Sequence, residues 1–237
     1  MGLFSSVLHL RDIERDRLVP AVDAVLRDAG FVREYLGTVP AGGPHTLPEH
    51  DGPCYVASAL SGRWITLIET SLGMPNAPHL AQLCTRLSST LSCYALSLVV
   101  HDDDLFFYNL DYKGHALDGY NSFPQYFEEK RMTEADIEGQ RHTPEPFAAL
   151  LPSNRTLEEL RSLLDRGWWH AHDNGRLDQD GVPVEDDDGF LFEGDRMTAF
   201  GTLLQLHGTS GPYPYAGWAN DDGIHWPSFL AIRYRRA

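Results

Sequence analysis

The sequence has few cysteines, no long apolar run, and far fewer basic than acidic residues. Three of its 237 residues are cysteine, and no CxxC pair occurs. No stretch reaches the roughly 18 apolar residues that a membrane-spanning helix needs, so a transmembrane protein is not expected. Lys and Arg number 19 against 34 Asp and Glu, which gives a formal charge of −15. Because phosphates need cations to bind them, this surplus of acid argues against nonspecific binding to nucleic acid.

The odd number of cysteines predicts reduced thiols rather than a disulfide framework. Cys84 and Cys93 fall on one predicted helix, nine residues apart. At about 100° per residue they point to opposite faces of that helix. We interpret both, together with Cys54, as small core residues of a soluble, cytoplasmic protein. No basic stretch precedes an apolar core at the N-terminus, so no secretory signal is expected.

Several catalytic signatures are also missing. The chain contains no GxGxxG after a strand, no GxxxxGK[ST], no HExxH and no GxSxG. Hydrophobic residues make up 42% and charged residues 22%, which is close to the globular norm and excludes wholesale disorder. Composition therefore predicts a folded protein but indicates no reaction.

Apolar periodicity predicts an α+β fold with a mostly antiparallel sheet. One amphipathic helix is expected at 13–29, and a second carries leucines 80, 83, 87 and 91. The order strand, helix, strand, strand occurs twice, which suggests a duplicated βαββ unit within residues 3–112. The predicted strands of this region are 3–10, 31–39, 54–60, 63–70, 94–101, 105–112 and 115–120.

The sequence divides into a sheet domain at 1–127 and a helical, loop-rich part at 128–237 that packs on it as one compact unit. Thr133 with Asp136 is predicted to start a short helix, and Thr156 with Glu159 has the spacing of a capping box. Asp195 is predicted to cap a last helix, and 229–234 to form a closing strand.

The stretch 168–173 reads WWHAHD and is the first candidate for chemistry. On a strand, His170 and His172 would share a face with Cβ atoms about 7 Å apart. Together with Asp173 they would suit Zn²⁺ or another first-row metal. The alternative is solvated histidines beside packed tryptophans. No cofactor is expected apart from this candidate divalent metal.

A second candidate is the acidic strand end at 101–104, with His101, Asp102 and Asp104. These side chains would either form a turn or supply further metal ligands or an acid–base group. The acidic segment 178–188 does not match an EF-hand. When Gly181 is placed at the sixth position of that loop, the first ligand position falls on Arg176, which is a cation.

A third candidate is a set of aromatic residues near glycines and prolines. These residues would either line a binding surface or cover the core beneath an irregular loop. The set comprises Trp168, Trp169, Tyr213, Tyr215, Trp218 and Trp226.

These observations favour a non-catalytic module that binds a basic protein. Bacterial immunity proteins and inhibitors of basic toxins use such charge, which accelerates association. The alternative is a metal-dependent hydrolase or small-ligand protein with its site between the sheet and the C-terminal part. No nucleic-acid or membrane partner is expected, and the oligomeric state stays open.

Overall fold

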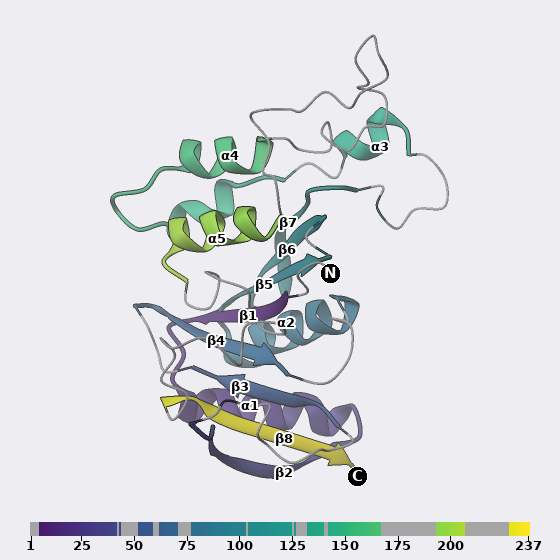
Figure 1. The fold of residues 1–237 in the computed structure, drawn as a ribbon, viewed down its shortest axis with the longest axis vertical. Helices are drawn as coiled ribbons and strands as arrows, with labels where there is room; N and C mark the ends of the chain where they lie inside the picture. Colours follow the sequence, from purple (N-terminus) through teal and green to yellow (C-terminus); the bar gives the residue numbers. More distant parts are fainter. Residues whose placement is uncertain are drawn as a thin grey trace.

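The computed structural model describes residues 5–41, 43, 52–58, 62–70, 77–102, 104–124, 126, 132–139, 142–166, 193–206 and 228–237. Within these ranges the chain forms an eight-stranded antiparallel sheet with helices on both faces (Figure 1), which confirms the predicted α+β class. The order of strands across the sheet is β2-β8-β3-β4-β1-β5-β6-β7.

The strands of the sheet are β1 (Ser5–Arg11), β2 (Phe31–Thr38), β3 (Cys54–Ala57), β4 (Trp64–Glu69), β5 (Tyr94–His101), β6 (Leu105–Tyr112), β7 (His115–Asn121) and β8 (Leu230–Arg236). The helices are α1 (Arg15–Asp28), α2 (Ala77–Leu91), α3 (Glu134–Glu138), α4 (Leu157–Asp165) and α5 (Glu193–Leu204), with a 3₁₀ turn η2 (Glu145–Ala149).

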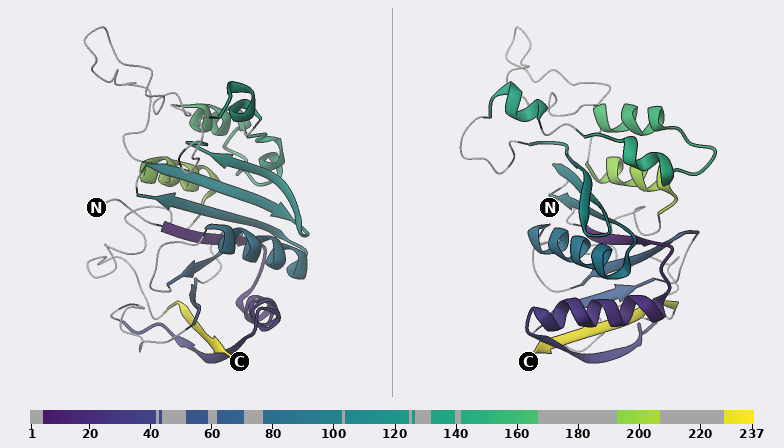
Figure 2. Two further views of the ribbon diagram at one scale, coloured as in Figure 1. Left: turned by 90° about the vertical axis from the view of Figure 1, so that its right-hand side faces the viewer. Right: turned by 180° about the vertical axis from the view of Figure 1, so that it is seen from behind.

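Helices α1 and α2 pack on one face of the sheet, and Figure 2 shows both on the near side when the molecule is seen from behind. Their apolar stripes supply Val22 and Leu26 from α1, and Leu83 and Leu87 from α2, to one buried cluster with Leu8 of β1. Every residue of β1 is buried, because the strand is central and has both faces covered.

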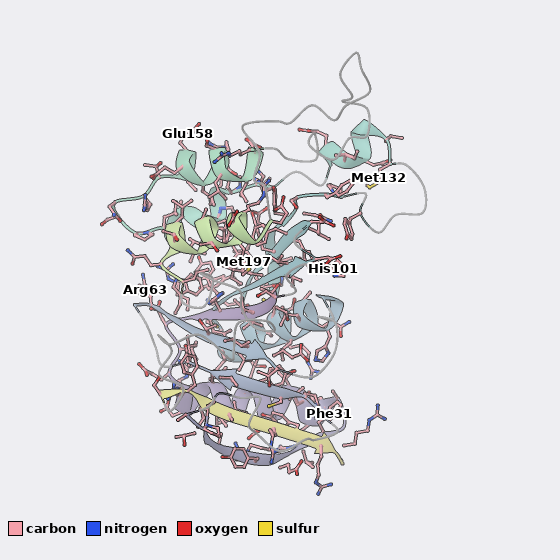
Figure 3. All side chains as sticks on the ribbon, viewed as in Figure 1. Phe31, Arg63, His101, Met132, Glu158 and Met197 are labelled. Atoms are coloured by element: carbon pink, nitrogen blue, oxygen red, sulfur yellow. The ribbon has the colours of Figure 1, made fainter. Side chains whose placement is uncertain are left out.

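Helices α4 and α5 and the turn η2 belong to a second core on the opposite face. Four of its aromatic side chains are fully or almost fully buried, namely Phe106 and Tyr108 of β6, Phe147 of η2 and Phe200 of α5. Met197, labelled on α5 in Figure 3, has no exposed surface and belongs to the same cluster. The C-terminal helices are therefore held to β6 by aromatic packing.

Most helix ends lie where the sequence predicts them. The capping boxes of Thr133 with Asp136 and Thr156 with Glu159 are both present, and they open α3 and α4. Helix α1 ends just before Gly30, whose φ of 84° is readily reached without a side chain. The prediction for α5 is wrong by three residues, because the helix begins at Glu193 rather than after Asp195.

The second predicted helix ends before Cys93, although the sequence pattern predicts Cys84 and Cys93 on one helix. Helix α2 ends at Leu91, so Cys93 lies beyond it rather than on the same helix as Cys84. Ser92 has a φ of 55°, and the Ser88 hydroxyl donates to the carbonyl of Cys93 at 2.9 Å. This turn ends the helix and leads directly into β5.

Strand β8 comes from the end of the chain but lies inside the sheet, between β2 and β3. Ile232 pairs with Leu36 on one side and with Tyr55 on the other. The predicted C-terminal strand is thus confirmed. The division at residue 127 and the duplicated βαββ unit stay predictions.

Candidate functional site

A network of buried polar side chains lies where β6 and β7 meet the C-terminal helices. The Tyr120 hydroxyl of β7 donates to the carbonyl of Leu164 at 2.8 Å. The Tyr108 hydroxyl of β6 donates to Asp118 at 2.7 Å, and Asp118 accepts the backbone N–H of Thr143 at 2.8 Å. These bonds tie the sheet to the end of α4 and to the segment that leads into η2.

Arg196 and Glu193 form a buried ion pair in the first turn of α5. Arg196 Nε lies 2.7 Å from Glu193 Oε2, and the side chains are only 1% and 5% exposed. Arg196 Nη1 also donates to the carbonyls of Leu163 and Leu164, at 3.0 and 3.3 Å. The pair therefore connects α5 to the end of α4.

The electrostatics of this pair follow from its burial. Burial raises the pKa of the Glu193 carboxyl, and this outweighs the opposing attraction of Arg196 and the hydrogen bond from Ser122. The guanidinium lies 5.9 Å from the centroid of the Tyr120 ring, which provides a further favourable cation–π contact. The arrangement holds a carboxylate in a poorly solvated position next to its counter-ion.

His142 stands at the edge of the same network. Its Nε2 lies 3.2 Å from Asp165 Oδ1, and its ring centroid is 5.7 Å from that of Tyr120. The side chain is 2% exposed, and Nδ1 is buried without a hydrogen-bond partner among the described residues. In the tautomer whose Nε2–H donates a hydrogen bond to Asp165, Nδ1 is unprotonated. Its lone pair can then accept a hydrogen bond or bind a metal ion. That geometry suits a base or a ligand atom.

The acidic strand end forms the turn between β5 and β6. Asp102 has a φ of 54°, and the backbone N–H of Asp104 donates to the carbonyl of His101 at 3.1 Å. The ring of His101 meets Tyr126 edge-on at 5.6 Å, and the Tyr126 hydroxyl lies 3.4 Å from Asp104. The backbone of this segment thus forms a turn. Electrostatic repulsion from Asp104 also contributes to the raised pKa of Glu193 at the start of α5.

A row of aromatic and cationic side chains crosses the other end of the sheet. Arg11 of β1 lies opposite Trp64 of β4, and Tyr94 of β5 lies opposite Tyr112 of β6. The Tyr94 and Tyr112 rings stack with centroids 4.3 Å apart, and the Arg11 guanidinium lies 5.4 Å from the Trp64 centroid. Figure 3 places Arg63, which precedes Trp64, far from His101 across the sheet.

The other predicted site residues lie outside the described part of the chain. These are His170, His172 and Asp173 of the candidate metal set, and the aromatic residues Trp168, Trp169, Tyr213, Tyr215, Trp218 and Trp226. Within the described residues, no group of three or more His, Cys, Asp or Glu side chains has a metal-binding arrangement.

The three cysteines are buried and form no disulfide. Burial raises the pKa of each thiol, to about 11 for Cys93. At neutral pH they are therefore protonated and unreactive, as expected of core residues.

Sequence reasoning missed the network around Tyr120. His142 and Asp165 are 23 residues apart and share no short motif. Glu193 and Arg196 are three residues apart, a spacing that brings side chains together on a helix. This signal predicts the ion pair only if both residues are known to lie on α5. No pattern in the sequence brings Leu164, His142 and Tyr120 together.

No protein-family model, curated protein or solved structure matches this chain. In the described ranges, none of the helices has both the length and the apolar character needed to span a membrane.

Proposed function

We propose that the protein binds a basic protein partner through its surplus of carboxylates, in the manner of an inhibitor or immunity protein. The charge of −15 is the observation that carries this proposal. A surface of one sign attracts an oppositely charged partner and can raise association rates by about 10- to 1000-fold at low salt.

The ion pairs of the fold support the same proposal. Six arginines are held by carboxylates of the same chain: Arg63 by Asp12, Arg33 by Asp23, Arg86 by Asp28, Arg155 by Glu159, Arg161 by Glu145 and Arg196 by Glu193. Exposed carboxylates such as Glu14, Asp16, Glu34 and Asp195 form no ion pair with a described residue. These acids are available to a partner.

The sequence adds a concentrated acidic segment. Seven of the sixteen residues at 173–188 are Asp or Glu, against one basic residue, Arg176. Blocks of like charge are typical of segments that interact with an oppositely charged surface.

The test is capture of partners by the immobilised protein from extracts of its native cells, at low and at high salt. We expect a basic protein to bind, and its association rate to fall by about tenfold or more as salt is raised. A variant with Glu185→Gln, Asp186→Asn, Asp187→Asn and Asp188→Asn should bind it more slowly. The control, matched in charge, neutralises four carboxylates that are paired with arginines, namely Asp28, Glu145, Glu158 and Glu159. A partner that is indifferent to salt and to both variants, or no partner at all, would contradict the proposal.

A second candidate function is supported by His142. This residue lies between the sheet and the C-terminal part, with Asp165 on Nε2 and a buried, unpartnered Nδ1 among the described residues. Metal-binding histidines usually donate their other N–H to a carboxylate or carbonyl in this way. A small-ligand site or a metal-dependent hydrolase site is thus the alternative proposal, and a metal would need ligands besides His142, since the described residues hold no group of three such side chains.

Titration of the dialysed protein with Zn²⁺ and Mn²⁺, followed by calorimetry, tests this alternative. We expect about one ion to bind per chain if the site is a metal site, and His142→Gln to weaken binding. His115→Gln serves as control, because His115 is an exposed residue at the start of β7. Absence of saturable binding, or equal binding by the His142 variant, would rule out a metal held by His142.

A further inference from the structure

The row of side chains at the Arg63 end of the sheet contains an unsatisfied cation. Arg11 is the last residue of β1 and is only 6% exposed. Leu10 pairs with Ala95, so Arg11 lies beside Tyr94 on β5, and Trp64 faces it from β4. Trp64 and Tyr94 belong to the same buried cluster, which places the aromatic side chains on one face of the sheet on either side of Arg11.

The guanidinium of Arg11 has too few partners for its burial. Its Nε lies 3.8 Å from Asp12 Oδ2, which is beyond a hydrogen bond. Asp12 is instead engaged by Arg63, whose Nε donates to Oδ1 at 2.8 Å and whose Nη2 contacts Oδ2. Arg11 Nη1 is buried and donates to no group in the described part of the chain.

Two features of the surroundings favour an anion at this position. Burial lowers the pKa of the Arg11 guanidinium and repulsion from Arg63 lowers it further, and together they outweigh the opposing effects of Asp12 and Tyr94. A third cation, Lys113, lies 4.9 Å from the Tyr112 ring at the far end of the row. This end of the sheet therefore gathers basic groups in a protein that is strongly acidic overall.

We propose that Arg11 binds a small oxyanion, a carboxylate or phosphate group, at Nη1 between Trp64 and Tyr94. Guanidinium N–H groups match the oxygens of carboxylates and phosphates in geometry, and the bonds are strengthened by both charges. Of the two aromatic side chains, the partly buried Tyr94 offers apolar surface to the rest of the ligand, whereas Trp64 is only 3% exposed. Tyr94 is only partly buried and Arg63 is 62% exposed, so the row reaches the protein surface at its Arg63 end.

The experiment titrates the full chain with inorganic phosphate, acetate and benzoate at constant ionic strength, using calorimetry and tryptophan fluorescence. We expect saturable binding of at least one of these anions, with a fluorescence change that is absent from Trp64→Phe. Phosphate alone indicates a phosphate-bearing ligand, acetate a small carboxylate, and benzoate without acetate a carboxylate attached to a ring.

Substitutions decide whether Arg11 is responsible. Arg11→Gln should weaken binding by about ten- to a hundredfold, because a charged hydrogen bond is lost. Arg11→Lys keeps the charge but lacks Nη1, and should also weaken binding. Arg86→Gln is the control, because Arg86 is an exposed arginine of α2 that pairs with Asp28 and touches neither Arg11 nor Asp12, and it should retain most of the affinity. Near-ultraviolet circular dichroism confirms that each variant is folded.

Three results would overturn the proposal. These are no saturable binding of any of the three anions, unchanged binding by both Arg11 variants, and a loss in Arg86→Gln as large as that in Arg11→Gln. The last result would show that binding follows the net charge of the protein rather than Arg11. None of these outcomes depends on whether the protein has a basic partner.

Discussion

Replacing Arg196 with methionine is expected to lower the free energy of unfolding by about 3–5 kcal/mol. The substitution leaves Glu193 as a buried charge without its counter-ion, and it removes the donor to the carbonyls of Leu163 and Leu164. Urea unfolding, followed by circular dichroism, measures the change. The double variant Arg196→Met with Glu193→Leu should recover much of the loss, because no charge is then left buried.

The control for this prediction is Arg161→Met on α4. Arg161 pairs with Glu145 and Glu158, but its side chain is 38% exposed, so we expect a loss of at most about 1 kcal/mol. Equal losses of unfolding free energy in the Arg161 and Arg196 variants would contradict the prediction, because the buried pair would then matter no more than an exposed one.

The Arg196 variant should also be sensitive to pH in a defined direction. The pKa of Glu193 is raised above its usual 4.5 by burial, so the folded state binds a proton more tightly than the unfolded state. Stability therefore falls as pH rises through that raised pKa. Removing the Arg196 cation raises the pKa of Glu193 further. We expect Arg196→Met to be less destabilising at about pH 5 than at about pH 8, and the reverse order would contradict this reasoning.

Phe200→Ala is expected to cost about 3–5 kcal/mol of stability, as other buried phenylalanines do. The Phe200 ring has no exposed surface, and its centroid is 5.1 Å from that of Tyr108 and 5.7 Å from those of Phe106 and Phe147. Because these rings come from β6, η2 and α5, we also expect one cooperative transition rather than two. Differential scanning calorimetry measures both quantities.

Two further variants bracket this result. Phe200→Leu keeps most of the volume and should cost less than the alanine variant. Leu36→Ala removes the same kind of apolar surface from a position on β2 that is 44% exposed, and should change stability by about 0.5 kcal/mol or less. Two separate transitions, with only one shifted by Phe200→Ala, would instead favour a division into independent domains near residue 127.

The proposals differ in the residues that they require. Basic-partner binding depends on exposed acids such as those at 185–188, the second candidate on His142, and the anion site on Arg11. Each can therefore fail without affecting the others.

Much of the local structure could be predicted because it depends on neighbours in the chain. The stripes of α1 and α2, the capping boxes of Thr133 and Thr156, and the turn at Gly30 involve residues only a few positions apart. The strands β5 and β6 lie at the predicted residues, because their near-continuous apolar content favours a buried strand. Such signals are contained within one element.

The candidate sites could not be predicted in the same way. Tyr120, His142, Asp165 and Arg196 come from separate elements, and Arg11 meets Trp64 only because β1 pairs with β4. Periodicity states that a residue is buried but not which residue it meets.

By itself the sequence determined the α+β class, the amphipathic helices, most strand positions, the reduced cysteines and the surplus of acid. Only the tertiary structure decided that β8 enters the sheet between β2 and β3, that Arg196 is buried against Glu193 and α4, and that Arg11 lies between Trp64 and Tyr94. The reason is physical. Helix periodicity, caps and turns follow from steric and hydrogen-bonding preferences over a few residues, whereas strand order and buried polar contacts depend on how distant segments pack together.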